Sequence, residues 1–163
     1  MADLGQTLVD MHYQKVADLQ RRASAAIEQL SDDDVNWRPG EESNSIANLV
    51  IHMAGNLRQR FVAGIGGATD TRDRDWEFNT REHYTKDQIL DTLNESFSTA
   101  ARAVAEVTPE RLGERFLNWD ETLLEVIFGV ATHLSEHVGQ ILYIAKLRRG
   151  PDYQILWTPH KRP

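Results

Sequence analysis

The stretch of the chain that decides its fold runs from Thr122 to Leu147 and reads TLLEVIFGVATHLSEHVGQILYIAKL. Its apolar residues recur every three or four positions, which is the period of an amphipathic α-helix with one face in a protein core. His133 and His137 fall on that apolar face one turn apart, so both imidazoles should project to the same side. Burying two polar rings without partners is unfavourable, and a shared metal ion satisfies them best.

Three more long helical patterns precede this stretch. In each of them the apolar side chains recur at helical spacing, and they cover roughly residues 3–30, residues 43–45 to 65, and residues 85–108. A polar connection, residues 70–84, separates the second pattern from the third. Thr85 and Thr122 are each followed three residues later by Gln or Glu, which predicts a capping box at both helix starts. Strand patterns are weak, so we predict an all-α fold, a four-helix bundle with at least one long crossover connection.

Composition limits the classes of function. A chain of 163 residues fits a single domain, residues 1–163, with one core. The net charge of −7 argues against a nucleic-acid partner, because the phosphate backbone would be repelled. The chain has no cysteine, which excludes disulfides, thiolate ligands and a thiol nucleophile of its own. We see no signal-peptide pattern and no apolar run of membrane-spanning length, so we expect a cytoplasmic protein without a membrane partner.

Two histidines make an incomplete metal site, because zinc-type sites usually have three or four protein ligands. The candidate third ligand is His52, at the edge of the apolar stripe of the second helix. Asn48 and Asn56 lie one turn to either side of it, which is typical of the lining of an internal cleft. The alternatives for His52 are an exposed helix edge or a hydrogen-bonded core histidine. For His12, on the apolar stripe of the first helix, we favour a hydrogen-bonded core histidine over a fourth ligand.

Residues 133–137 also match H-x-x-E-H, a pattern of some metallopeptidases in which the glutamate is the base. There a further carboxylate completes the site downstream, and here only Asp152 follows, beyond the expected end of the helix. Glu136 also points about 100° around the helix from His137. A metal-dependent hydrolase is therefore a remote alternative, with Glu136 in solvent or behind the ligands. We expect the Arg/Asp-rich segment at residues 70–75 to be solvated.

Two segments, NSIANLVIHMAGN at residues 44–56 and HLSEHVGQI at residues 133–141, resemble the DinB-like superfamily of metal-binding four-helix bundles. The resemblance covers nearly the whole chain, including the WRP segment at residues 37–39. It implies a divalent ion held by one histidine of the second helix and an H-x-x-x-H pair of the last helix. Those positions are His52, His133 and His137 in this sequence. Members of the superfamily are similar to bacillithiol or mycothiol transferases and maleylpyruvate isomerases, although many have no established activity.

The resemblance implies a divalent-metal-binding protein that acts as a metal-dependent thiol S-transferase on small electrophiles. Because the chain has no cysteine, a low-molecular-weight thiol would have to be a co-substrate. Imidazole sites accept zinc, nickel, iron or copper, so the metal stays open. Asn56 and Gln140, each one turn from a proposed ligand, are the catalytic candidates for orienting an imidazole or the substrate.

A protein of another class is the alternative, namely a non-catalytic, structural metal-binding bundle that forms a dimer. The chain has more large apolar side chains than a four-helix core of this size needs, among them Phe97, Phe116, Phe128, Leu156 and Trp157. Twofold dimers are the commonest oligomers, so we expect a homodimer.

Overall fold

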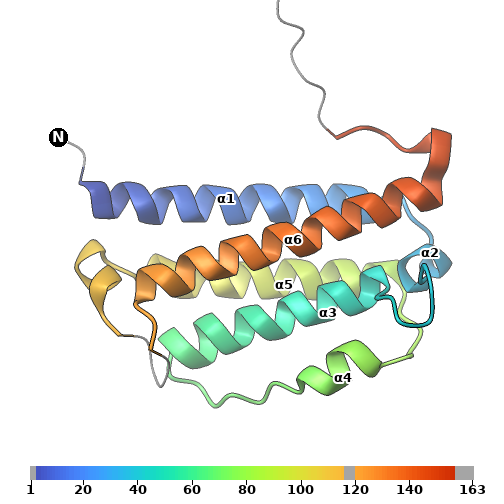
Figure 1. Ribbon diagram of the computed structural model, residues 1–163. Helices are drawn as coiled ribbons and strands as arrows, with labels where there is room; N and C mark the ends of the chain where they lie inside the picture. Colours follow the sequence, from blue (N-terminus) through green and yellow to red (C-terminus); the bar gives the residue numbers. More distant parts are fainter. Residues whose placement is uncertain (1–2, 116–119, 157–163) are drawn as a thin grey trace, which may run out of the picture.

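The computed structural model describes residues 3–115 and 120–156, and their regular elements are helical (Figure 1). Four long α-helices carry most of the chain, and they are α1 (Leu4–Ile27), α3 (Ile46–Leu57), α5 (Lys86–Ala105) and α6 (Leu123–Arg149). Two short α-helices, α2 (Asp32–Asn36) and α4 (Arg74–Asn79), lie in the connections. Strand-type pairing in the described ranges is limited to an isolated bridge between Arg115 and Thr122. The prediction of an all-helical fold is therefore confirmed for the residues that the structure describes.

The four long helices lie side by side, and each packs against two neighbours (Figure 1). α1 contacts α5 and α6, and α3 also contacts α5 and α6. In Figure 1, α1 and α6 run in one direction while α3 and α5 run in the other. Because α3 and α5 point the same way, the chain between them has to return along the length of the helices. It does so through α4, which packs on α3, so the expected long crossover connection is present.

Local signals set the helix ends. The capping boxes predicted at Thr85 and Thr122 are confirmed, because each threonine hydroxyl accepts from a backbone N–H while the Gln or Glu side chain accepts in return. Two glycines that follow helices have positive φ, 72° for Gly67 and 54° for Gly150, a conformation that other residues rarely adopt.

The structure corrects three of the predicted boundaries. α1 ends at Ile27 rather than near residue 30. The second helix does not run uniformly to residue 65, because after Leu57 it continues as a π-helix, η1 (Arg58–Ile65). The connection at residues 70–84 is not simply a polar loop, since it contains α4 with Asp73 as its N-cap. Two 3-10 turns complete the described chain, η2 (Pro109–Gly113) and η3 (Gly150–Asp152).

Apolar side chains from all four long helices meet in one core. Its largest fully buried members include Leu19, Leu49, Met53, Phe61, Leu93, Phe97, Leu134 and Ile141. Burying a side chain of this size contributes about 1.5–3 kcal/mol relative to leaving it in water. Over the residues that can be described, no helix is both long and apolar enough to cross a membrane.

The apolar residues behind the homodimer prediction divide into different environments. Phe97 belongs to the core with 1% of its surface exposed, so it is not spare apolar material. Phe128, on α6, is 72% exposed, and Leu156 is only partly buried. Phe116 and Trp157 lie outside the described residues. The homodimer stays a prediction, and Phe128 is its main remaining support.

His12 is buried in α1, as expected, with 7% of its surface exposed. Its ring meets the edge of Phe61 at a centroid distance of 5.9 Å. The expected hydrogen bond is not found at Nδ1, because no described residue lies within bonding distance of this buried atom. Burial lowers the pKa of His12 to about 4, so the ring is neutral at pH 7.

The lowered pKa of His12 predicts a loss of stability in mild acid. Between about pH 6.5 and pH 4 the unfolded chain binds a proton at this residue that the folded protein does not. The contribution of the neutral His12 ring to the free energy of unfolding is therefore fully present above pH 6.5 and is lost as the pH falls towards 4. It amounts to a decrease on the order of 2–3 kcal/mol in the free energy of unfolding. Urea unfolding of the metal-free protein at pH 7 and pH 4.5 measures it, and His12→Phe should lose less stability than wild type.

A matched control is His83→Phe, because it makes the same substitution at an exposed histidine. Equal pH dependence in wild type and His12→Phe would contradict the assignment of a buried neutral imidazole.

Candidate metal centre

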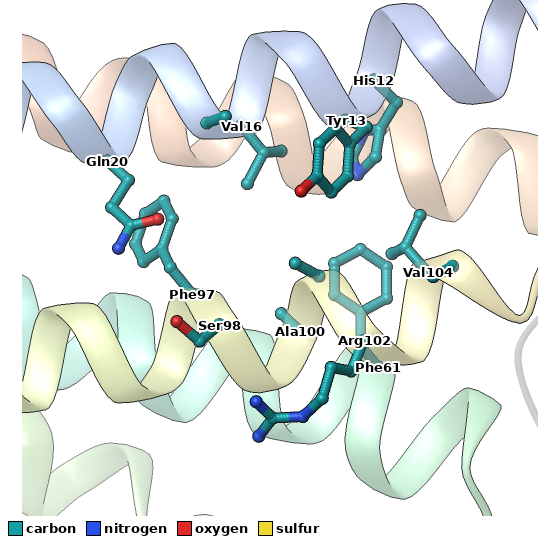
Figure 2. Close-up of a pocket in the computed structure, with 13 residues that line it drawn as sticks. His12, Tyr13, Val16, Gln20, Phe61, Phe97, Ser98, Ala100, Arg102 and Val104 are labelled. Carbon is teal, nitrogen blue, oxygen red and sulfur yellow. The ribbon is translucent and has the colours of Figure 1, made fainter.

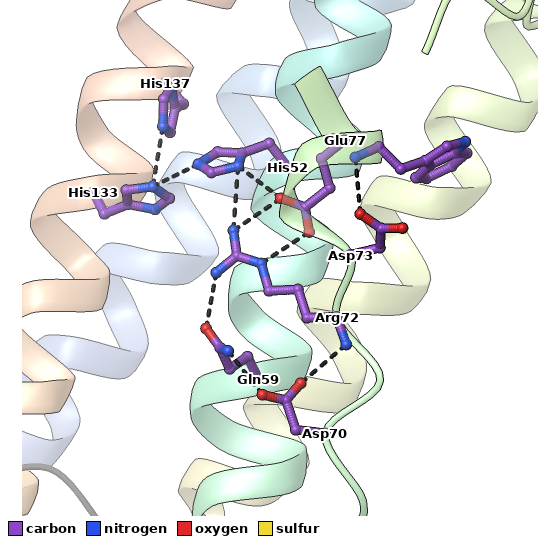
Figure 3. Close-up of polar contacts among 9 residues, drawn as sticks. His52, Gln59, Asp70, Arg72, Asp73, Glu77, His133 and His137 are labelled. Carbon is purple, nitrogen blue, oxygen red and sulfur yellow. Dashed lines mark hydrogen bonds and ion pairs between the residues drawn. The ribbon is translucent and has the colours of Figure 1, made fainter. Parts of the chain in front are cut away.

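Three histidines converge between α3 and α6. His52 lies in the middle of α3, and His133 and His137 lie one turn apart in α6 (Figure 3). The Nε2 atom of His133 is 2.9 Å from Nε2 of His52 and 3.1 Å from Nε2 of His137. One ligand atom from each of the three histidines lies within 4.8 Å of the others. The structure thus brings together all three predicted ligand positions.

The spacing of these nitrogens suits a metal ion. Zinc binds imidazole nitrogen at about 2.0–2.1 Å, so two nitrogens of a tetrahedral site lie roughly 3.3 Å apart. The observed separations of 2.9 and 3.1 Å are a few tenths of an ångström shorter. A small outward movement of the rings is enough to admit an ion.

The hydrogen-bond partners of the Nδ1 atoms determine which Nε2 atoms carry a lone pair. Nδ1 of His52 lies 2.9 Å from the Glu77 carboxylate, which only accepts, and 3.2 Å from Nη2 of Arg72, which only donates. The carboxylate is the closer neighbour, and Nη2 already donates to it at 2.9 Å, so we assign the proton to Nδ1 and a lone pair to Nε2. Nδ1 of His137 lies 3.4 Å from the Gln140 side-chain oxygen, which favours the same tautomer. Two lone pairs therefore face Nε2 of His133, and a single proton there can satisfy only one of them. A cation between the rings can accept a lone pair from Nε2 of each of the three histidines.

Glu77 is a residue of the candidate site that the sequence did not predict. It lies in α4 with 3% of its surface exposed, and its carboxylate accepts the hydrogen bond from His52. A carboxylate behind a ligating imidazole fixes the ring orientation and raises its basicity. The stretch offered one signal, because Glu77 stands between Trp76 and Phe78 in a polar connection. Phe78 packs on the His52 ring at a centroid distance of 4.4 Å, so this connection covers the site.

Arg72 corrects the expectation that residues 70–75 are solvated. Its guanidinium binds both carboxylate oxygens of Glu77, at 2.8 and 2.9 Å, and its side chain is only 9% exposed. It also donates to the Gln59 side-chain oxygen at 2.9 Å. Asp70 closes the network by accepting from Gln59 and from the backbone N–H of Arg72 (Figure 3). The buried charge of Glu77 is thus paired and held in place.

Gly55 and Asn48 let α4 lie this close to α3. A Cβ atom on Gly55 would lie 1.9 Å from a Glu77 carboxylate oxygen, so only glycine leaves room for it. The Asn48 side-chain amide donates to the backbone oxygens of Glu77 and Thr80, at 2.9 and 3.3 Å. The sequence suggested that Asn48 lines an internal cleft, and the structure shows that it does not. It attaches the crossover to α3.

Burial and charge keep the site in the protonation state that a cation needs. Burial, with the neighbouring charges of His137 and His52 as smaller causes, lowers the pKa of His133 to about 4. Burial also lowers the pKa of His137. Burial alone would raise the pKa of Glu77, but the hydrogen bonds from His52 and Arg72 and the Arg72 charge lower it below its usual value. At neutral pH both α6 histidines are neutral and Glu77 is ionised.

The two catalytic candidates lie on either side of the cluster. Gln140 contacts His137 through its side-chain oxygen, as an orienting residue would. Asn56 makes no described contact with an imidazole. Instead it lines a cavity of about 150 Å³ together with His133, Arg60 and Glu121. The Asn56 side-chain oxygen and Nδ1 of His133 are buried and have no hydrogen-bond partner among the described residues.

The remaining candidates lie outside the cluster. Glu136 and Asp152 are both exposed, and neither belongs to the histidine cluster, so neither supplies the carboxylate that the metallopeptidase pattern requires. His12 is not a member of the cluster that could hold an ion, which agrees with its assignment to the core. The sixth histidine of the chain, His160, lies outside the described residues.

A family model described as a protein of unknown function, DUF1572, matches residues 3–162 of the chain. No curated protein gives a significant match.

Proposed function

The chain belongs to the DUF1572 family, and we propose that it is a DinB-like four-helix bundle that binds one divalent metal ion through His52, His133 and His137. One observation carries the proposal, namely the convergence of the Nε2 atoms of the three histidines. In two of these rings the Nδ1 atom also has a partner, Glu77 for His52 and Gln140 for His137. The side-by-side packing of α1, α3, α5 and α6 supports the four-helix assignment.

We propose further that the site transfers a low-molecular-weight thiol to small electrophiles. A divalent ion held by neutral imidazoles keeps its charge and lowers the pKa of a thiol or water at an open position. The side chains have separate parts in this function. Glu77 orients His52, Phe78 covers its ring, and Asn56 presents an unused hydrogen-bond acceptor in the cavity beside His133. Zinc, nickel and iron all suit this donor set.

A conjugation assay tests the enzymatic part. The protein, purified without a polyhistidine tag, is mixed with a panel of low-molecular-weight thiols and an activated aryl halide, and product absorbance is followed. We expect turnover that a chelator abolishes and a divalent ion restores. His133→Ala should be inactive with every thiol. Turnover that survives complete metal removal would refute the proposal.

A second candidate is a metal-binding protein without catalysis, and one observation favours it. Two carboxylates of the site and its cavity are already engaged, Glu77 with His52 and Arg72 and Glu121 with Arg60. Neither is left as a general base. Stoichiometric metal without turnover in the conjugation assay would favour this second candidate.

A further inference from the structure

A second cavity lies away from the histidine cluster, between α1, α5 and η1 (Figure 2). Its volume is about 340 Å³, which is in the range of sites that hold small molecules. The residues that line it come from these three elements, and neither α6 nor any of the three converging histidines contributes. This cavity is therefore separate from the proposed metal centre.

The walls of the cavity are mostly aromatic and aliphatic, with Gln20 and Ser98 among their few neutral polar residues. Phe61 and Phe97 are almost completely buried and flank it, with Val16 above and Ala100 below in Figure 2. Among the described lining residues there is no carboxylate, and the one cation is Arg102. Its guanidinium points away from the cavity in Figure 2 and donates to the Thr99 hydroxyl. These walls suit a neutral ring, because a charged ligand would lose its hydration without gaining a partner.

One polar side chain in this wall has unused hydrogen-bonding capacity. His12 is more than nine-tenths buried, and Figure 2 shows its ring directed from α1 towards Phe61. Its Nδ1 atom has no partner among the described residues, which is an unfavourable state for a buried polar atom. A neutral imidazole has one donor and one acceptor, and the terminal torsion of histidine is broad, so either nitrogen can be presented. A hydroxyl group, which both donates and accepts, matches either nitrogen.

We propose that this cavity binds a small neutral aromatic molecule that carries one hydroxyl group, with the ring between Phe61 and Phe97 and the hydroxyl on His12. This binding does not require the metal ion. Binding in this cavity between α1 and α5 would be a second function, in addition to the one proposed for the metal centre between α3 and α6.

The test uses phenol and benzene as paired probes on the full chain. Backbone amide NMR shifts are followed during titration. We expect phenol to shift the signals of Val16, Phe97 and Val104 and to bind more tightly than benzene. His12→Phe should weaken phenol by about 2- to 10-fold, the worth of one hydrogen bond, and leave benzene within twofold.

A filled cavity provides the control for location. Ala101 lines the cavity from α5 and is only partly buried, so Ala101→Leu should fold and weaken both probes about tenfold. Ala25→Leu is the matched variant, because Ala25 lies in α1 with similar burial but does not line the cavity. It should leave both affinities unchanged. Phenol binding that Ala101→Leu leaves intact, or a preference for phenol over benzene that survives in His12→Phe, would overturn the proposal.

Discussion

His133→Ala is expected to abolish stoichiometric binding of a divalent ion, and His137→Ala and His52→Ala to reduce the affinity severely. His133 is the central member of the cluster, because its Nε2 atom is the one close to both other rings. An ion held at this point links α3 to α6, so binding also stabilises the fold. At a metal concentration of 100 times Kd the gain is about 2.7 kcal/mol, or an increase in Tm of about 5–10 °C.

Metal analysis after dialysis and thermal melts with and without the ion measure this prediction. The gain in Tm should be absent in His133→Ala. His12→Ala should retain the metal, because His12 lies in the core and outside the cluster. Metal retained by His52→Ala but lost by His12→Ala would place the third ligand on α1 and contradict the proposed site.

Much of this arrangement is predictable because it depends on local signals. The apolar period of α6 and its capping box determine where the helix begins and which face carries His133 and His137. The position of His52 on α3 follows from the same kind of pattern. That the three residues meet depends on how α3 packs against α6, which the resemblance to a known superfamily implied and periodicity alone did not.

The rest of the site escaped prediction for a physical reason. Glu77 and Arg72 are charged residues in a polar connection, and such residues are usually solvated. Their burial depends on each other, because the ion pair offsets the loss of hydration, and on Gly55, which leaves space on α3. A dependence that joins residue 55 to residues 72 and 77 has no helical or strand period. Only the aromatic residues on both sides of Glu77 indicated that this connection packs against the helices rather than lying in solvent.

Gly55→Ala is expected to lower metal affinity by about 10- to 100-fold, the usual effect of losing the group that orients a ligating histidine. The new methyl group would occupy the place of the Glu77 carboxylate, 1.9 Å from its oxygen, and so move it away from His52. Alanine favours a helix over glycine by about 1 kcal/mol, so the loss of affinity would not reflect a weaker helix. Gly139→Ala on α6 is the matched control, because its Cβ meets nothing within 4 Å. It should leave the affinity unchanged.

A double-mutant cycle shows whether Gly55 acts through Glu77. Glu77→Ala should lower metal affinity to a similar extent, and adding Gly55→Ala to it should cost nothing more, because no carboxylate remains to be displaced. Glu77→Ala also leaves Arg72 without its buried partner, which destabilises the fold by about 3–5 kcal/mol, so affinity has to be measured well below the melting temperature. Independent, additive losses in the two variants would mean that Gly55 affects the metal by another route. Full affinity in Glu77→Ala would mean that α4 covers the site without tuning it.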